Sequence, residues 1–306
     1  MNRQTRKVVS FILKVVSDKN HFFFWLFVRF VSATLPLVTI YQFSHVVKLV
    51  ENQTPVNLVL WAVFLIFVIR IIDNFLRLRS ISKLEKAISD ISFNIHNFFL
   101  SDLKTETTEE RHAIVQAIRN FADASSVTLN LIKQPGIDSL VSLIFVPSIL
   151  FFLDFQIFII TVVSILIYYF IDHYTTQRYA QLKDIQNTKT EAYYAKLVED
   201  NDFELEQATY SRHFKRLTHW SFIEWFSLQN TAVLFYSLSL FSLIHLISQG
   251  NRDISNLVLV MGYVSQVQVF LNSFSQIQDS LADMFVGLEH LAKNQSVAAI
   301  DLDDLI

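Results

Sequence analysis

The residues best placed to do chemistry in this chain are amides and hydroxyls spaced along one apolar segment near the C-terminus. From residue 254 to just beyond 274, polar residues recur every three or four positions, which places them on one face of a helix. They are Ser265, Gln268, Asn272, Ser275 and Gln276. Because an unpaired amide is costly to bury in lipid, this face must point at a cavity, at water or at another helix. We predict that it lines a substrate path, with hydrogen bonding between helices as the alternative.

Residues for covalent, metal-assisted or acid–base catalysis do not assemble into a recognisable site. The chain has no Cys, and its nine His residues show no paired spacing typical of a metal site. With only four Gly, it lacks the Gly-x-x-x-x-Gly-Lys-Ser/Thr loop that holds a nucleotide phosphate. We therefore expect no catalytic residue, no metal and no cofactor in this chain. The sequence also has no block of basic residues of the kind that indicates nucleic-acid binding.

Ionisable residues in or beside the apolar segments are functional candidates by default. We expect Arg29, two turns inside the first segment, to extend its guanidinium to the lipid head groups. Asp73 has Arg70 and Arg77 three and four residues away, which explains it as an ion-pair partner. For Asp172, at the end of the fourth segment, a proton relay is an alternative to a surface position.

No ladder of acidic residues within the membrane is evident from the sequence.

Glu224 precedes Trp225, and His219 precedes Trp220, just before the fifth apolar segment. We interpret this group as an interfacial aromatic belt.

The elements that must position these residues are six long apolar segments. The chain is 52% hydrophobic and only 17% charged, whereas about a quarter of the residues of a soluble domain are charged. A hydrocarbon core of about 30 Å needs roughly 20 helical residues. The predicted spans are 22–47, 56–72, 140–153 with the helical stretch before it, 155–171, 226–247 and 254–274. We therefore predict an all-α integral membrane protein with six transmembrane helices.

Two intervals, about 77–133 and 175–219, are charged, rich in helix formers and almost free of Gly and Pro. We predict that each extends two spans into the cytoplasm as a helical hairpin. The predicted organisation is a tail with an interfacial amphipathic helix (1–20), a six-span domain carrying the two arms (21–293) and an acidic tail (294–306).

The basic residues predict the orientation. Of the 25 Lys and Arg residues, all but Arg29, Lys48 and Arg252 lie on the side of the N-terminus and the two arms. Since basic residues are enriched in cytoplasmic segments, we expect a multi-pass protein of the inner (plasma) membrane of a bacterial cell, with both termini cytoplasmic.

This layout resembles the transmembrane domain of ABC exporters over nearly the whole chain. Residues 98–103 and 109–120 look like the first internal loop of that family, although Glu110 stands where a Gly is common. Residues 197–214, with Glu199, Glu206, Ala208, Tyr210 and Phe214, look like its second loop.

The resemblance implies that short coupling helices, around 101–112 and 199–208, dock on an ATP-binding domain. The coupling residues it implies are Ser101, Asp102, Leu103, Lys104, Glu109, Arg111, Glu199, Asp202, Phe203, Glu204 and Glu206. We therefore expect the membrane subunit of an ABC-type transporter that moves an amphipathic substrate by alternating access.

The expected partners are the lipid bilayer, a separately encoded nucleotide-binding ATPase and a second membrane subunit, identical or related. ATP and Mg would bind only to the ATPase. The alternatives are a proton-coupled transporter of the same fold, which needs no ATPase, and a membrane scaffold or regulator that transports nothing.

Overall fold

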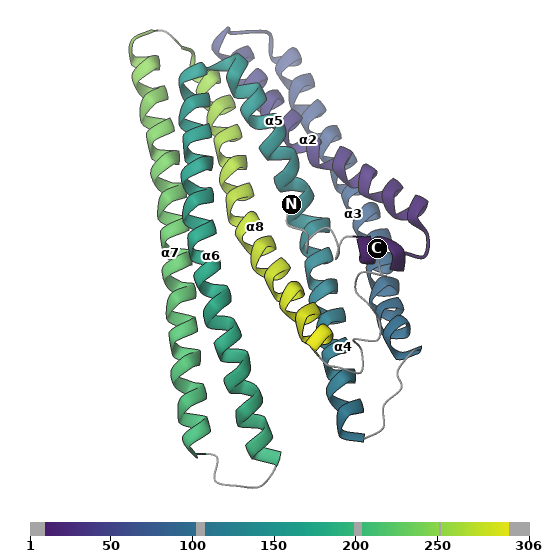
Figure 1. The fold of residues 1–306 in the computed structure, drawn as a ribbon. Helices are drawn as coiled ribbons and strands as arrows, with labels where there is room; N and C mark the ends of the chain where they lie inside the picture. The colour runs from purple at the N-terminus through teal and green to yellow at the C-terminus, as the bar shows by residue number, and fades with distance from the viewer. Residues whose placement is uncertain (1–9, 102–107, 199–203, 251, 294–306) are drawn as a thin grey trace.

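The computed structural model describes residues 10–101, 108–198, 204–250 and 252–293, and its elements are all helices, without a strand among these residues (Figure 1). They are α2 (Lys19–Glu51), α3 (Val56–Ser101), α4 (Thr108–Leu131), the π-helix η1 (Ile132–Gly136), α5 (Ile137–Leu153), α6 (Phe155–Val198), α7 (Glu204–Ser248) and α8 (Ile254–Lys293). Six helices are long and apolar enough to cross a bilayer, with α4, η1 and α5 together forming the third. This confirms the all-helical prediction and its six apolar segments, and the chain is described below as a membrane protein.

The helices are much longer than a membrane requires. Helix α3 has 46 residues. At 1.5 Å per residue it is roughly 70 Å long, more than twice the thickness of a hydrocarbon core of about 30 Å. Helices α6 and α7 have 44 and 45 residues, so they too continue well beyond their apolar parts.

Large apolar side chains cover the outside of the bundle. Trp61, Phe67, Phe152 and Phe241 are all more than half exposed. In water such a surface would be unstable, whereas in lipid it needs no protein cover. The exposed apolar surface is therefore the expected outer face of a membrane bundle.

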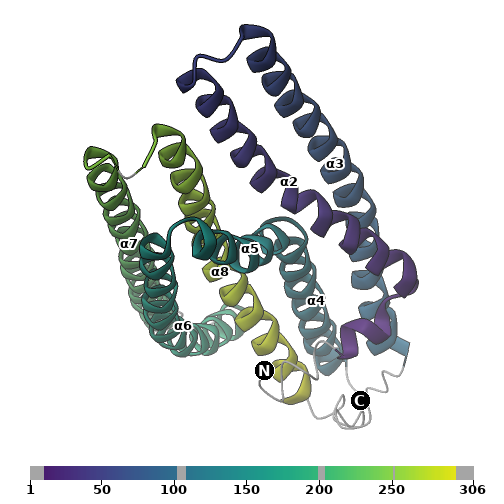
Figure 2. The same cartoon turned by 90° about the horizontal axis from the view of Figure 1, so that it is seen from above.

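Helix α8 lies between two helical hairpins. One hairpin is α2 with α3, the other is α6 with α7, and α8 packs against α2, α4, α5, α6 and α7. Seen from above, α8 and α5 separate the two hairpins (Figure 2). Half of the most apolar window of α8 is buried, against 11% for α3. Helix α8, which carries the predicted substrate path, is thus the central helix of the bundle.

Short turns join the helices at one end of the molecule, and ionic side chains connect them. The Glu51 carboxylate at the end of α2 accepts hydrogen bonds from the backbone N–H groups of Ile254 and Ser255, at 3.1 and 3.3 Å. Asp154, between α5 and α6, accepts a hydrogen bond from Arg252 at 3.3 Å. Glu51 therefore caps the N-terminus of α8, where the helix dipole favours a negative charge.

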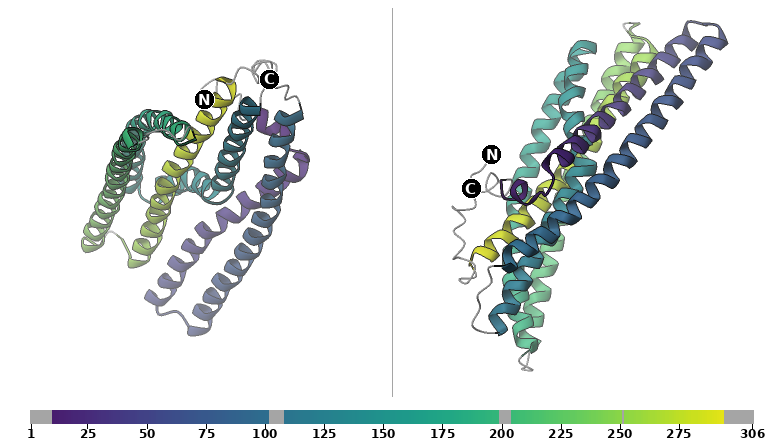
Figure 3. Two further views of the ribbon diagram at one scale, coloured as in Figure 1. Left: turned by 90° about the horizontal axis from the view of Figure 1, so that it is seen from below. Right: turned by 90° about the vertical axis from the view of Figure 1, so that its right-hand side faces the viewer.

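The two predicted arms, α3 with α4 and α6 with α7, extend toward the opposite end of the molecule (Figure 1). Helices α3 and α4 on one side, and α6 and α7 on the other, project in the same direction (Figures 1 and 3). Their connecting residues, 102–107 and 199–203, lie outside the described part. The helical character of the predicted arms is present on both sides of these gaps.

The N-terminal segment packs on the first of these arms. Residues 10–15 are helical, and Phe11 and Ile12 are buried among side chains of α3, α4 and α8. The ring centroids of Phe11 and Phe99 are 5.5 Å apart, and those of Phe11 and Phe121 are 6.1 Å apart. The apolar face of this segment therefore contacts protein, where the sequence had suggested the membrane interface.

The expectation that Arg29 reaches the head groups is wrong. Its side chain is fully buried, and Nη2 lies 2.6 Å from Asp138 Oδ2. The guanidinium also donates to the carbonyl oxygens of Lys133 and Gln134, at 3.2 and 3.0 Å. These carbonyls belong to η1, where Pro135 supplies no backbone N–H. Arg29 thus satisfies backbone groups of the irregular turn between α4 and α5.

Candidate functional site

Polar side chains of α6, α7 and α8 gather along the line where these three helices meet, and we call this set the polar seam. It consists of Thr161, Ser164, Tyr168 and Asp172 of α6, Glu224 and Ser239 of α7, and Gln268, Ser275 and Asp279 of α8. Spacings of three and four place the α6 members on one helical face. The seam begins in the apolar part of the bundle and continues toward the arms.

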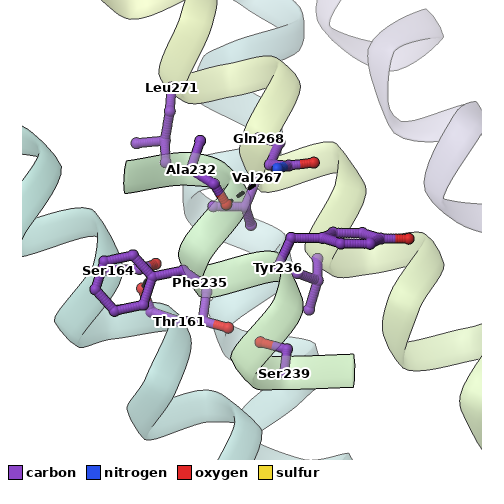
Figure 4. Close-up of a pocket in the computed structure, with 10 residues that line it drawn as sticks. Thr161, Ser164, Ala232, Phe235, Tyr236, Ser239, Val267, Gln268 and Leu271 are labelled. Atoms are coloured by element: carbon purple, nitrogen blue, oxygen red, sulfur yellow. Dashed lines mark hydrogen bonds between the residues drawn. The ribbon is translucent and has the colours of Figure 1, made fainter. Parts of the chain in front are cut away.

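At the apolar end, the seam surrounds a small pocket (Figure 4). Its cavity volume is about 10 Å³, roughly the room that one water molecule needs. Its lining residues are Thr161, Ser164, Ala232, Phe235, Tyr236, Ser239, Val264, Val267, Gln268 and Leu271. The Gln268 amide donates to the Ala232 carbonyl oxygen at 3.0 Å, and Ser164 donates to that of Thr161 at 2.6 Å. The pocket is therefore mostly apolar, with a few hydroxyl groups at its wall.

The residues of the predicted polar face of α8 lie in different surroundings. Gln268 lies against α7 in the pocket, and Ser275 faces the Asp172 carboxylate of α6. Ser265 donates to the Gly262 carbonyl oxygen of its own helix at 2.9 Å, and Gln276 is exposed. The side chain of Asn272 falls outside the described part. The structure brings Gln268 and Ser275 to the seam, and their role in a substrate path stays a prediction.

Toward the arms, one carboxylate from each helix enters the seam. Asp172 is fully buried and Glu224 is 4% exposed. Asp279 is partly buried, and it experiences repulsion from both Glu224 and Asp172. The Thr176 hydroxyl donates to Glu224 Oε1 at 3.4 Å. We call Asp172, Glu224 and Asp279 the acidic cluster.

Several buried oxygen atoms of the seam have no hydrogen-bond partner among the described residues. They are both carboxylate oxygens of Asp172, Oδ1 of Asp279, Oγ1 of Thr161 and the hydroxyl of Tyr168. Ser275 faces Asp172, yet no hydrogen bond of ordinary geometry joins them. A buried polar group without a partner is costly, so this concentration of them is unusual for a purely structural contact.

Metal binding is not favoured by this arrangement. Within the described ranges, no group of three or more His, Asp or Glu side chains is close enough to hold a metal ion. The acidic cluster therefore has three carboxylates near one another without the short spacing that a shared ion requires.

The residues expected to contact an ATPase lie mostly where their side chains are not described. Asp102, Leu103, Lys104, Glu199, Asp202 and Phe203 lie outside the described residues, and Ser101, Glu109, Arg111 and Glu206 belong to helices but their side chains are not described. Glu204 is exposed at the start of α7. The coupling role of all eleven therefore stays a prediction.

Sequence reasoning missed most of the acidic cluster. The interfacial aromatic belt assigned to Glu224 is wrong for this side chain, because Glu224 is buried between α6 and α7. Nothing in the sequence singles out Asp279, because it follows the sixth apolar segment. A signal was present: Thr161, Ser164, Tyr168 and Asp172 repeat every three or four residues, as the polar face of α8 does.

No protein-family model matches the sequence, and no curated protein matches it. The fold and composition define an all-helical protein with six helices that can span a bilayer.

Proposed function

We propose that this chain is the membrane subunit of an ABC-type transporter, driven by a separately encoded ATPase that docks on the two helical arms. Closure of a pair of ATPase subunits would move the arms, and the arms would switch the bundle between inward-open and outward-open forms. The substrate class we propose is amphipathic, because the pocket wall combines apolar side chains with a few hydroxyl and amide groups.

One observation carries the proposal. Helices α3, α6 and α7 continue without a break from apolar segments into long extensions that project in the same direction, away from the short turns (Figure 1). A continuous helix transmits a displacement along its length, whereas a flexible loop would absorb it. Arms of this kind are what a cytosolic motor needs in order to act on a membrane bundle.

The proposal is tested by purifying the full-length chain from its native membranes in mild detergent. Mass spectrometry would identify bound proteins, and ATP hydrolysis would be measured on the complex. We expect a stoichiometric partner with a phosphate-binding loop. Deleting residues 199–208 from the second arm should remove the partner and the hydrolysis. The matched control, Asn52→Ala in the turn between α2 and α3, should retain both because it lies at the opposite end.

A chain that purifies without any nucleotide-binding partner, and without ATP hydrolysis, would contradict this proposal. The second candidate function is then transport driven by protons across the same bundle. The acidic cluster favours it, because buried and partly buried carboxylates on three helices are suited to exchanging protons during a conformational change.

A further inference from the structure

The acidic cluster joins three helices that belong to different parts of the bundle. Asp172 and Glu224 lie on the α6–α7 hairpin, whereas Asp279 lies on the central helix α8. The hairpin and α8 meet over only part of their length, and their lower parts diverge (Figure 1). The cluster combines carboxylates of the hairpin with one of α8, so a change in its charge acts on the contact between the hairpin and α8.

The charged and titratable groups around the cluster are mainly acidic or phenolic. On α6 they are Tyr168, His173, Tyr179 and Lys183, and on α8 the additional group is Asp283. Lys183 attracts Asp279, and His173 attracts Asp172. No ion pair within 4.0 Å joins any of the three carboxylates to a described cation. The negative charges are therefore not neutralised by direct contact.

A second, independent observation points to a ligand at the cluster. The Tyr168 side chain is 1% exposed, and its hydroxyl has no hydrogen-bond partner. It lies one turn before Asp172 and is close enough to interact electrostatically with all three carboxylates. A buried phenol beside unpaired carboxylate oxygens can donate to one of them, and it can accept from another only when that carboxyl group is protonated.

Protons are the ligand that fits this set. Two buried carboxylates and one partly buried carboxylate, without a direct counter-ion, repel one another, and binding a proton removes the cost of withdrawing each charge from water. A metal ion would need closer ligands than the described residues provide. A proton also needs no cavity, and each protonated carboxyl becomes a hydrogen-bond donor to its neighbours.

We propose that Asp172, Glu224 and Asp279 form a proton-binding site that holds the α6–α7 hairpin against α8. With protons bound, the three carboxyl groups are neutral, so the repulsion between the hairpin and α8 is absent. When the protons leave, the negative charges repel, and the hairpin moves away from α8. The site therefore couples protonation to the separation of the two arms. It would act whether the energy for transport comes from ATP or from protons, so this inference does not depend on the ATPase.

The experiment uses the absence of Cys from the 306 residues of the sequence. Gln181→Cys on α6 and Asn120→Cys on α4 place spin labels on exposed positions of the two arms. The distance between the labels is measured by pulsed electron paramagnetic resonance from pH 5 to pH 9, in liposomes. We expect the distance distribution to shift to longer values, by at least a few ångströms, as the pH rises.

The test variants are D279N alone and D172N/E224Q/D279N together, with D90N as the matched control. Asp90 is an exposed carboxylate of α3 outside the seam. The triple variant should lose the pH-dependent shift and D279N should reduce it, whereas D90N should keep it. A potentiometric titration of the same proteins should show fewer protons released by the triple variant than by D90N.

The proposal is overturned if the distances do not change with pH, or if the triple variant shifts as the parent does. It is also overturned if the distance between the labels changes when choline ions in the buffer are replaced by sodium ions at constant pH, and does not change with pH. If the triple variant does not fold, the proposal is tested by whether D279N reduces the pH-dependent shift and by the number of protons that the parent protein releases. A failure to find an ATPase partner would not change the expected dependence of the label distance on pH, so the two proposals can fail separately.

Discussion

At the residue scale, Arg29 illustrates how a charge in a membrane helix acquires partners. It lies on α2, yet its partners are Asp138 and the carbonyl oxygens of η1, more than 100 residues later in the chain. Arg77 of α3 shares the same carboxylate, with Nη1 3.1 Å from Asp138 Oδ2. Two guanidinium groups and one carboxylate therefore connect three of the six long helices. Such a network is costly to disrupt once it is buried.

Replacing Arg29 with Ala should destabilise the fold by about 3–5 kcal/mol, because the carbonyls of η1 lose their donors and a buried cavity remains. Unfolding in detergent measures this cost. Arg79→Ala is the control, since Arg79 is exposed on the neighbouring helix and should change stability by less than about 0.5 kcal/mol. Equal effects of the two substitutions would show that the buried network contributes nothing.

Gln268 distinguishes the two interpretations of the polar face of α8. Because its amide donates to the Ala232 carbonyl of α7, Gln268→Leu should destabilise the bundle by about 1 kcal/mol in the same unfolding assay. The exposed Gln276→Leu should have no such effect. If Gln268→Leu leaves the unfolding free energy unchanged, the amide does not join the helices, and the substrate-path interpretation becomes the stronger one.

Pairs of residues close together in the sequence were easier to predict than pairs from different helices. Asp73 was expected between Arg70 and Arg77, and the ion-pair distances are 3.8 and 3.6 Å. That prediction is confirmed, because neighbours three and four residues apart on a helix are fixed by its geometry. The partners of Arg29 come from another helix, and no spacing within one segment contains that information.

At the scale of the elements, Gly262 allows α8 to approach α2 closely. A Cβ atom at Gly262 would lie 2.6 Å from Cγ2 of Ile40. Small residues at such contacts let membrane helices pack tightly, since lipid provides no hydrophobic force between them. The central position of α8 thus depends in part on the absence of a side chain at this residue.

Gly262→Ala should destabilise the bundle by about 1–3 kcal/mol, despite the better helix propensity of Ala. Combining it with Ile40→Ala should recover part of this loss, because the truncated side chain leaves room for the new methyl group. A double-mutant cycle of unfolding free energies measures the interaction. Strictly additive effects would mean that the two helices do not touch here.

The type of each element was predictable, but its surroundings were not. Long apolar runs with few Gly and Pro predicted the helices, and α3, α6 and α7 do continue into the predicted arms. The π-helix at Pro135 was not foreseen, since a single Pro gives no sign of how the chain adjusts to it. The acidic cluster as a whole was not predictable either, because it forms only when α6, α7 and α8 pack together.

At the scale of the whole molecule, the short turns lie at one end, and the described parts of both arms project toward the other. The distribution of Lys and Arg predicts that the arms are cytoplasmic. Asn52→Cys in a turn should therefore react with a membrane-impermeant maleimide in right-side-out vesicles, and Asn120→Cys on an arm only in inside-out vesicles. The reverse pattern would invert the orientation, and reaction of both in one vesicle type would refute the six-span topology.

The claim that an ATPase docks on the arms is tested most directly by cross-linking in living cells. A photo-reactive amino acid would replace Asp202 in the second arm and, as the control, Asn52 in a turn at the other end. We predict that position 202 cross-links to a cytosolic protein with a phosphate-binding loop and that position 52 does not. The account would be contradicted if position 202 formed no cross-link to such a protein in cells where the chain is assembled in the membrane.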